Sequence, residues 1–273
     1  MVVYSRQTLR RLLGTAHLMD TYVGQVAATT PIVNYSINLL DGALADLSLS
    51  GQGLYVGSWV WLSGAEFRVA SFNVASGALV SQAATTATIA VQGAEYERHD
   101  AVRPSDKNRA LDEAIKRLRV RQEVGLQGID GRTAYPLPAS VEQVLGGYYF
   151  ASPDGTASRG QTRLNAVRVV TTGSGPEVRI DPAIGGSQQL VLDAITTPTL
   201  GSAETATVSI PDERLVLYAA EAECWGMLTR DAPVGAMASY RERQNQAALQ
   251  HARLAARYAV PVDRVLRLDE GPF

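Results

Sequence analysis

Residues 212–231, DERLVLYAAEAECWGMLTRD, are the stretch on which the predicted fold depends. Asp212 follows Pro211 and is a predicted N-cap, because its carboxylate can accept a hydrogen bond from an otherwise unpaired amide of the first turn. Apolar side chains then recur at helical spacing, and a break at 231–235 (DAPVG) ends the pattern. These positions are Leu215, Val216, Ala219, Ala222, Trp225 and Leu228.

A second helix is predicted directly after this break, from about Ala236 to Tyr258. Its frequent alanines permit close packing, so residues 212–258 are expected to form a hairpin of two antiparallel helices. The side chains expected to face inward are Met237, Tyr240, Ala248, Ala252 and Ala255.

Two further helices are predicted earlier in the chain. The first spans about Ser5 to Met19, with Ser5 as N-cap and an apolar face made of Leu9, Leu12, Leu13 and Ala16. The second spans about Ser105 to Val124, enters through Pro104 and is capped by Ser105. Its apolar stripe consists of Leu111, Ala114, Ile115 and Leu118.

Short strands are predicted in two long intervals, from Val23 to Asp100 and from Gly125 to Ile210. Alternating segments with turn signals between them favour small antiparallel barrels or sandwiches. The segments are 32–39, 59–62 and 66–70 in the first interval, and 164–171, 177–180, 189–192 and 205–210 in the second. The step at 135–138 (YPLP) is expected at a sheet edge or outside the ladder, because proline cannot donate a backbone hydrogen bond.

The predicted fold class is therefore α+β: a helical bundle carrying two antiparallel β insertions of barrel or sandwich type and an extended C-terminal arm. The bundle combines residues 1–22, 104–125 and 212–258. The first β module covers 23–103, the second covers 126–211, and the arm covers 259–273.

Composition gives little support to catalysis. Lys and Arg total 25 against 27 Asp and Glu, a net charge of −2, which excludes a generally basic nucleic-acid binder. The single cysteine, Cys224, excludes a cysteine-based zinc site and is expected to be a buried thiol. The three histidines, His17, His99 and His251, lie in no recognisable catalytic motif and are expected at the surface or partly packed. We predict no enzyme activity, no cofactor and no metal.

Membrane association is not expected either. No apolar core of an export signal follows the arginines of the N-terminal segment. The uncharged stretch 69–94 is rich in Ser, Thr, Gln, Asn and Gly, unlike a membrane helix. The chain is therefore expected to be made in the cytoplasm.

Residues 104–125 hold the one local excess of positive charge, which includes Lys107, Arg109 and Lys116 as well as Arg117, Arg119 and Arg121. A solvated helix face explains such a cluster. A contact between subunits is the sharper alternative, because Arg pairs with carboxylates in a bidentate way. DNA binding is a third alternative, although the local net charge is small. We predict that Arg117, Arg119 and Arg121 contact a neighbouring subunit.

Several segments together suggest a family. They are EYERH (95–99), PSD (104–106) and NRALDEA (108–114), then AYPLP (134–138), VEQVL (141–145) and SIP (209–211) before the helix pair. In this order the chain resembles the head-to-tail adaptor (connector or neck) proteins of tailed bacteriophages. The resemblance implies a structural virion protein, present as a ring of identical subunits, normally twelve. It implies portal and tail or neck proteins as partners, and a lumen that conducts DNA without reading its sequence.

Two alternatives remain open. One is another ring component of the virion, such as a tail tube, tail terminator or baseplate protein, which would be dominated by strands. The other is a carbohydrate-active or carbohydrate-binding module, in which Trp59, Trp61, Tyr148 and Tyr149 would line a sugar cleft.

The last segment, VPVDRVLRLDEGPF (260–273), is predicted to dock onto the portal. Pro261 prevents continuation of the preceding helix, and the segment mixes apolar anchors with arginines. Addition to an exposed sheet edge is the favoured mode, and packing back onto its own subunit is the alternative. The predicted docking residues are Val262, Arg264, Val265, Leu266, Arg267, Leu268 and Phe273.

Overall fold

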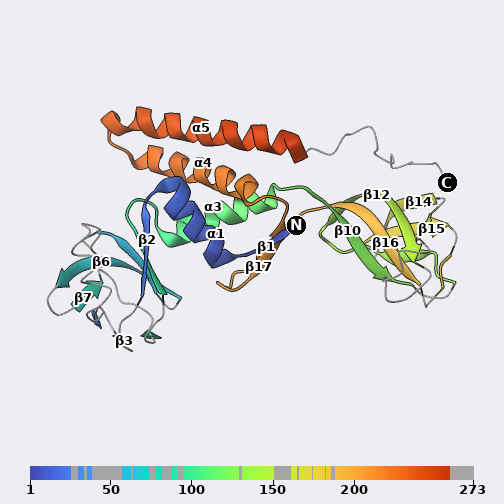
Figure 1. The fold of residues 1–273 in the computed structure, drawn as a ribbon, viewed down its shortest axis with the longest axis horizontal. Helices are drawn as coiled ribbons and strands as arrows, with labels where there is room; N and C mark the ends of the chain where they lie inside the picture. The colour runs from blue at the N-terminus through green and yellow to red at the C-terminus, as the bar shows by residue number, and fades with distance from the viewer. Residues whose placement is uncertain are drawn as a thin grey trace. The chain divides into compact units, whose positions relative to one another are not determined.

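The computed structural model describes residues 1–25, 30–33, 36–38, 57–62, 64–73, 78–81, 88–90, 95–128, 131–150, 161–164, 166–173, 175–181, 183–185 and 188–258. The predicted docking segment 260–273 lies outside the described residues. The chain divides into two compact units, shown in Figure 1. Unit 1 comprises Met1–Ile115 and Leu200–Ala256, and unit 2 is built on Lys116–Thr199.

Unit 1 contains an antiparallel sheet of eight strands. In sheet order these are β2 (Thr21–Gln25), β9 (Glu95–His99), β5 (Trp59–Leu62), β6 (Ala65–Asn73), β7 (Ala78–Ser81), β4 (Ser36–Asn38), β3 (Thr30–Val33) and β8 (Thr88–Ala90). Strand β5 confirms the segment predicted at 59–62, and β6 includes the segment predicted at 66–70. The single strand predicted over 32–39 is instead divided between β3 and β4, which pair with each other.

A separate two-stranded sheet in unit 1 joins β1 (Val2–Ser5) to β17 (Thr207–Ile210). Strand β1 leads directly into helix α1 (Arg6–Leu12), and Ser5 accepts a hydrogen bond from the Thr8 amide, which confirms the predicted N-cap. A π-helical segment, η1 (Leu13–Leu18), continues α1 and ends at Met19 in the left-handed conformation.

Three longer helices complete unit 1: α3 (Pro104–Lys116), α4 (Glu213–Asp231) and α5 (Val234–Tyr258). The Asp212 carboxylate accepts from the Arg214 amide, so the predicted cap of α4 is confirmed. Helices α4 and α5 form the predicted hairpin, and Figure 1 shows them lying side by side. Their contact includes the rings of Trp225 and Tyr240, whose centroids are 5.5 Å apart.

The inward face of α5 agrees with the prediction only in part. Met237, Tyr240 and Ala255 are covered as predicted, but Ala248 and Ala252 are exposed, whereas Ala247 and Leu254 are buried. The covered positions include 237, 240, 244, 247, 251 and 254, which follow a seven-residue repeat that contains Gln244 and His251. Gln244 fits because it lies over Gly226, where an added Cβ would come 2.8 Å from its side-chain nitrogen.

Unit 2 consists of two antiparallel sheets that share one core. The first has the order β10 (Val120–Gln127), β16 (Gln189–Thr196), β12 (Val141–Phe150) and β13 (Gln161–Arg163). The second has the order β11 (Ala134–Pro136), β15 (Gly175–Asp181) and β14 (Ala166–Thr172). The core residues are Tyr135, Val144, Leu164, Val167, Val178, Ile180, Ile184, Leu190 and Leu192.

Two sequence features explain local details of unit 2. Pro136 lies on the edge strand β11, as predicted for a residue without a backbone donor. Gly147 lets β12 approach the core closely, because an added Cβ would lie 3.0 Å from Leu164 and 3.2 Å from Leu192.

The predicted fold class is wrong. In the part of the chain that the structure describes, strands form four sheets and helices are a minority, so the chain is not a helical bundle with two β insertions. One cause is the second predicted helix, which ends at Lys116 rather than Val124 because residues 120–127 form β10. Val120, Gln122, Val124 and Leu126 alternate with more exposed residues, which is a strand period. This helix also begins at Pro104 itself, so Ser105 lies within it and is not its cap.

Candidate functional site

A network of charged and polar side chains lies inside unit 1. We call it the buried charge network and define it by Arg10, Asp20, Glu97, His99 and Lys107. Each of these residues is at most 6% exposed. Helix α1, the turn before β2, strand β9 and helix α3 contribute its members. The network therefore joins segments that are far apart in the sequence.

Glu97 and Arg10 form the first half of this network. Arg10 donates from Nε to Glu97 Oε2 at 2.7 Å and from Nη2 to Glu97 Oε1 at 2.9 Å. Its Nη1 donates to Glu204 Oε1 at 2.8 Å, and the Trp61 ring lies 4.6 Å from the guanidinium carbon. Arg11 donates a further bond to Glu97 Oε1 at 2.9 Å. Glu97 is thus a buried carboxylate compensated by two guanidinium groups.

Lys107 and Asp20 form the second half. The Lys107 ammonium donates to Asp20 Oδ1, to Thr21 Oγ1 at 2.6 Å and to His99 Nδ1 at 2.9 Å, so three acceptors match its three protons. The other oxygen of Asp20, Oδ2, accepts from the Val102 amide at 3.0 Å. The network therefore also holds the chain between β9 and α3.

His99 connects the two halves. Because an ammonium group cannot accept a hydrogen bond, Nδ1 of His99 must be the acceptor from Lys107, and the ring must be neutral with its proton on Nε2. Nε2 faces Glu97 Oε2 at a distance of 3.2 Å. The contacts on both sides of the ring therefore select a single tautomer.

The surroundings change the pKa values of these groups. Burial lowers the pKa of His99 to about 4, although the neighbouring Glu97 carboxylate opposes this. Burial alone would raise the pKa of Glu97, but the contacts with His99 and Arg10 outweigh it and lower the pKa below its usual range. Burial also lowers the pKa of Lys107, against the attraction of Asp20.

Gly14 makes the close packing around Lys107 possible. A Cβ at this position would lie 2.0 Å from Thr21 Oγ1 and 3.0 Å from Lys107 Nζ. The π-helical segment η1 therefore needs glycine where it passes the buried charge network. Since the members of the network are almost inaccessible to solvent, a substrate cannot reach them in this arrangement, and their effect is to fix the segments that carry them.

These findings correct two sequence predictions. His99 is fully buried rather than superficial or partly packed, and Lys107 is buried rather than part of a solvated or subunit-facing cluster. His17 is partly packed as predicted, at 2.9 Å from Glu221, and Cys224 is buried as predicted. The burial of Lys107 could have been predicted from its position, because it lies one turn from Leu111 on the apolar stripe of α3.

The three arginines of the predicted subunit contact do not share a helix face. Arg121 lies on β10 and donates from Nε to Asp193 Oδ1 at 2.8 Å, and Arg119 forms an ion pair with Glu142. Arg117 is exposed, just after the end of α3.

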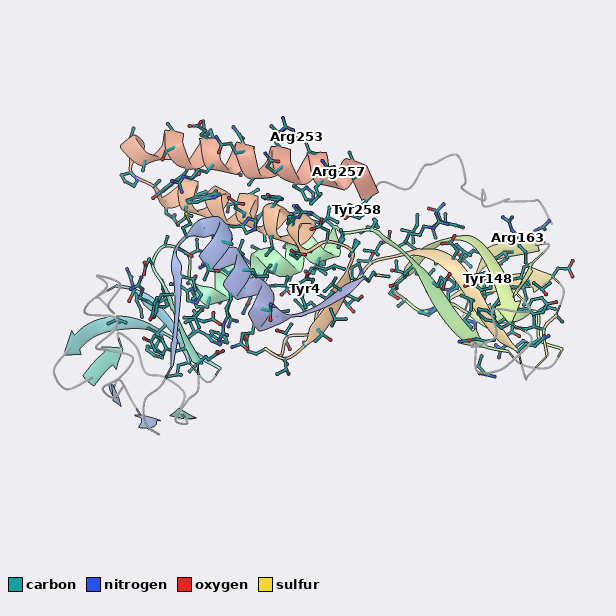
Figure 2. All side chains as sticks on the ribbon, viewed as in Figure 1. Tyr4, Tyr148, Arg163, Arg253, Arg257 and Tyr258 are labelled. Atoms are coloured by element: carbon teal, nitrogen blue, oxygen red, sulfur yellow. The ribbon has the colours of Figure 1, made fainter. Side chains whose placement is uncertain are left out.

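The aromatic residues of the sugar-cleft alternative also have other surroundings. In unit 1, Trp59 lies beside the guanidinium of Arg103, 4.8 Å away, and Trp61 lies beside Arg10. In unit 2, Figure 2 labels Tyr148, which is paired with Arg163 across β12 and β13, and Tyr149 packs against the core. Cationic side chains therefore lie over the rings of Trp59 and Trp61, where a sugar would need to stack.

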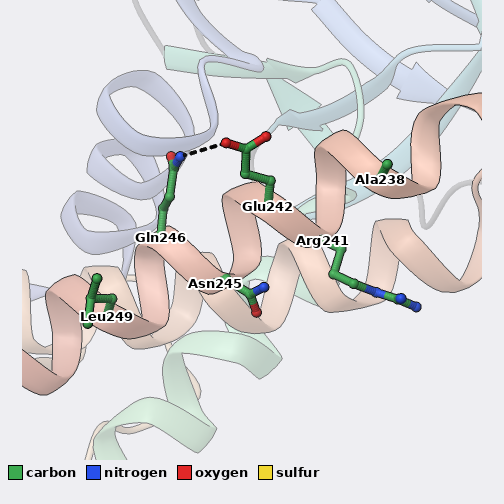
Figure 3. Close-up of a pocket in the computed structure, with 6 residues that line it drawn as sticks. All are labelled: Ala238, Arg241, Glu242, Asn245, Gln246 and Leu249. Atoms are coloured by element: carbon green, nitrogen blue, oxygen red, sulfur yellow. Dashed lines mark hydrogen bonds between the residues drawn. The ribbon is translucent and has the colours of Figure 1, made fainter.

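The outer face of α5 is a candidate surface for contact with another protein. A shallow groove of about 510 Å³ follows this face of the helix (Figure 3). Its lining residues are Ala238, Arg241, Glu242, Asn245, Gln246 and Leu249. Leu249 is 50% exposed, and Gln246 donates to Glu242 within the helix at 3.3 Å. Leu249 is the one large apolar side chain among these lining residues.

Comparisons with known proteins identify no relative: no family model and no curated protein matches this chain. Within the ranges that the structure describes, no cluster of three or more His, Cys, Asp or Glu side chains could hold a metal ion. Among the same residues, no helix combines the length and the apolar character that crossing a membrane requires.

Proposed function

We propose that this chain is a structural protein of a tailed-bacteriophage virion, a head-to-tail adaptor whose subunits form a ring beneath the portal. Its partners in this proposal are further copies of itself, normally twelve in total, the portal protein and adjoining tail or neck proteins. Genomic DNA would pass through the lumen without sequence recognition. The resemblance of segments 95–114 and 134–145 to adaptor proteins supports the family, and the outer face of α5 supports assembly.

The assembly proposal rests on helix α5, most of whose residues are exposed. The helix has 25 residues, a length of about 37 Å, yet Ala247 and Leu254 are its buried residues. Its opposite face presents the groove around Leu249. Closed rings need a heterologous contact, in which one surface of a subunit meets a different surface of the next. The outer face of α5 provides a suitable first surface, and exposed Arg117 of unit 2 is proposed to contribute to a contact together with Arg119 and Arg121.

We predict that Leu249→Glu disrupts the ring and leaves the subunit folded. The side chain is half exposed, so its replacement removes little from the core but places a charge in the proposed contact. Mass photometry and negative-stain images, with and without portal-bearing heads, should show at least a tenfold loss of ring particles. Gln250→Glu, which adds the same charge at an exposed position beside the groove, should assemble as the wild type does. Rings that form equally well with Leu249→Glu would contradict the role of α5.

Deleting residues 260–273 should prevent attachment to portal-bearing heads while the protein remains folded. The proposed reason is that this segment supplies apolar anchors, which Val265→Asp with Leu266→Asp should remove without shortening the chain. Co-sedimentation with heads measures attachment, and Asp263→Asn, at a position outside the predicted docking residues, serves as the control. Normal attachment of the truncated protein would rule out the docking segment.

The strand content favours a second candidate, another ring component of the virion such as a tail tube, tail terminator or baseplate protein. The same sedimentation experiment separates the two candidates when purified tails are added. Binding to heads supports the adaptor, and binding to tails alone supports the second candidate.

A further inference from the structure

His99 lies between two ion pairs that hold the N-terminal segment of unit 1. Lys107 with Asp20 lies on one side of the ring, and Arg10 with Glu97 lies on the other. Lys107 Nζ and Thr21 Oγ1 each lie 2.9 Å from Nδ1, and Glu97 Oε2 lies 3.2 Å from Nε2, so a second proton would have to sit on Nδ1, directly beside the Lys107 ammonium. A proton added to this ring therefore meets a charged neighbour, whereas a proton added to a histidine at the surface meets water.

The first consequence of protonation is a conflict at Nδ1. Lys107 Nζ donates to this atom over 2.9 Å, and a protonated imidazolium would present a second donor and a second positive charge there. Burial makes this contact costly, because little water is present to screen it. The charged and titratable groups around the pair are Glu97 of β9, Lys107 of α3, Asp20 before β2, Arg10 of α1 and Cys224 of α4.

The second consequence concerns the corner at Asp20. The backbone amide of Asp20 donates to the Gly14 carbonyl at 3.0 Å, and its backbone carbonyl accepts from the Asp100 amide at 2.9 Å. Its side chain is held by Lys107 and by the amide of Val102. Displacement of Lys107 would therefore weaken the attachment of η1 and β2 to β9 and to the start of α3.

We propose that His99 is an acid-sensitive joint: its protonation displaces Lys107 from Nδ1 and opens the contact of η1 and β2 with β9 and α3. The proposal concerns the conformation of unit 1 and does not depend on the proposed virion function. In the open form the ring meets water and takes up a proton near its ordinary pKa of 6.5. In the closed form burial lowers the pKa to about 4. The open form thus binds more protons between these values, so the closed form loses stability as the pH falls from 6.5 to 4, and His99 adds no further loss below 4.

The test uses the full chain and two measurements. In a variant with His17→Gln and His251→Gln, His99 is the one remaining histidine, so its ring nitrogens can be assigned directly by NMR. We expect Nδ1 to be unprotonated and the ring not to titrate above about pH 5. Hydrogen exchange of the β2 and η1 amides, corrected for intrinsic rates, should show opening that increases by up to about tenfold per pH unit below 6.5.

His99→Asn is the matched variant, because its side-chain oxygen can still accept from Lys107 but cannot titrate. Opening in this variant should be independent of pH between 6.5 and 5. Two results would overturn the proposal: titration of His99 near pH 6.5 in the folded protein, or the same pH dependence of opening in His99→Asn as in the wild type. If His99→Asn does not fold, the NMR titration of the native ring decides alone.

Discussion

Glu97→Gln should lower the free energy of unfolding of unit 1 by about 3–5 kcal/mol. The substitution keeps the size of the side chain but removes the negative charge that Arg10 and Arg11 share. Arg10 is fully buried, so with Glu97 neutral its charge would keep only the Glu204 carboxylate as an ionic partner in a place that water does not reach. Removing one partner of a buried ion pair leaves an uncompensated buried charge and is strongly destabilising. Replacing both partners by apolar residues, in contrast, often changes the stability little.

The measurement is denaturant unfolding followed by tryptophan fluorescence. Trp59, Trp61 and Trp225 are the three tryptophans of the chain, and all lie in unit 1, so the signal reports on this unit. Glu95→Gln is the control, since Glu95 pairs with Arg11 at the surface with 45% of its side chain exposed. It should cost no more than about 1 kcal/mol. Equal losses for the two variants would contradict the view that the buried charge network stabilises unit 1.

Leu192→Ala should destabilise unit 2 by about 2–5 kcal/mol. Leu192 lies on β16 and is fully buried in the core that the two sheets share. Truncation leaves a cavity beside Leu164 and Gly147, and the closely spaced strands can fill it only in part. Leu192→Met preserves most of the volume and should cost less than about 1.5 kcal/mol.

Hydrogen exchange of the β12 and β16 amides in increasing denaturant measures the stability of unit 2. The tryptophan transition, which reports on unit 1, should be unchanged in Leu192→Ala because the two units have separate cores. A shift of that transition by the same amount would mean that the units unfold as one.

Local sequence signals predicted several elements well. Helix α4 begins after Asp212 because a carboxylate cap and a long run of helix formers act within a few residues of each other. The caps at Ser5 and Asp212 and the edge position of Pro136 are likewise local effects of hydroxyl, carboxylate and ring chemistry. Such features do not depend on what the rest of the chain does.

The candidate surfaces were harder to predict. The arginines at 117, 119 and 121 are predicted to lie on the helix over 105–124, but α3 ends at Lys116 and β10 begins at Val120, which places Arg121 on a strand and the other two before it. Pairing with β16 along eight residues outweighed the helix propensity of this basic segment. The prediction of the inward face of α5 holds for Met237, Tyr240 and Ala255 but is wrong for Ala248 and Ala252, because Gln244 and His251 occupy inward positions that a search for apolar residues passes over.

By itself the sequence determined where helix α4 starts and stops, that a second helix follows it directly and runs to Tyr258, that short strands lie in the two long intervals, and that Cys224 is buried. These results follow from interactions between residues a few positions apart and from the cost of exposing apolar surface. Only the tertiary structure decided that strands dominate and that Arg10, Asp20, Glu97, His99 and Lys107 lie together inside unit 1. A charged side chain can be buried only when its partner is present, and here the partners come from α1, β9 and α3, which folding alone brings together.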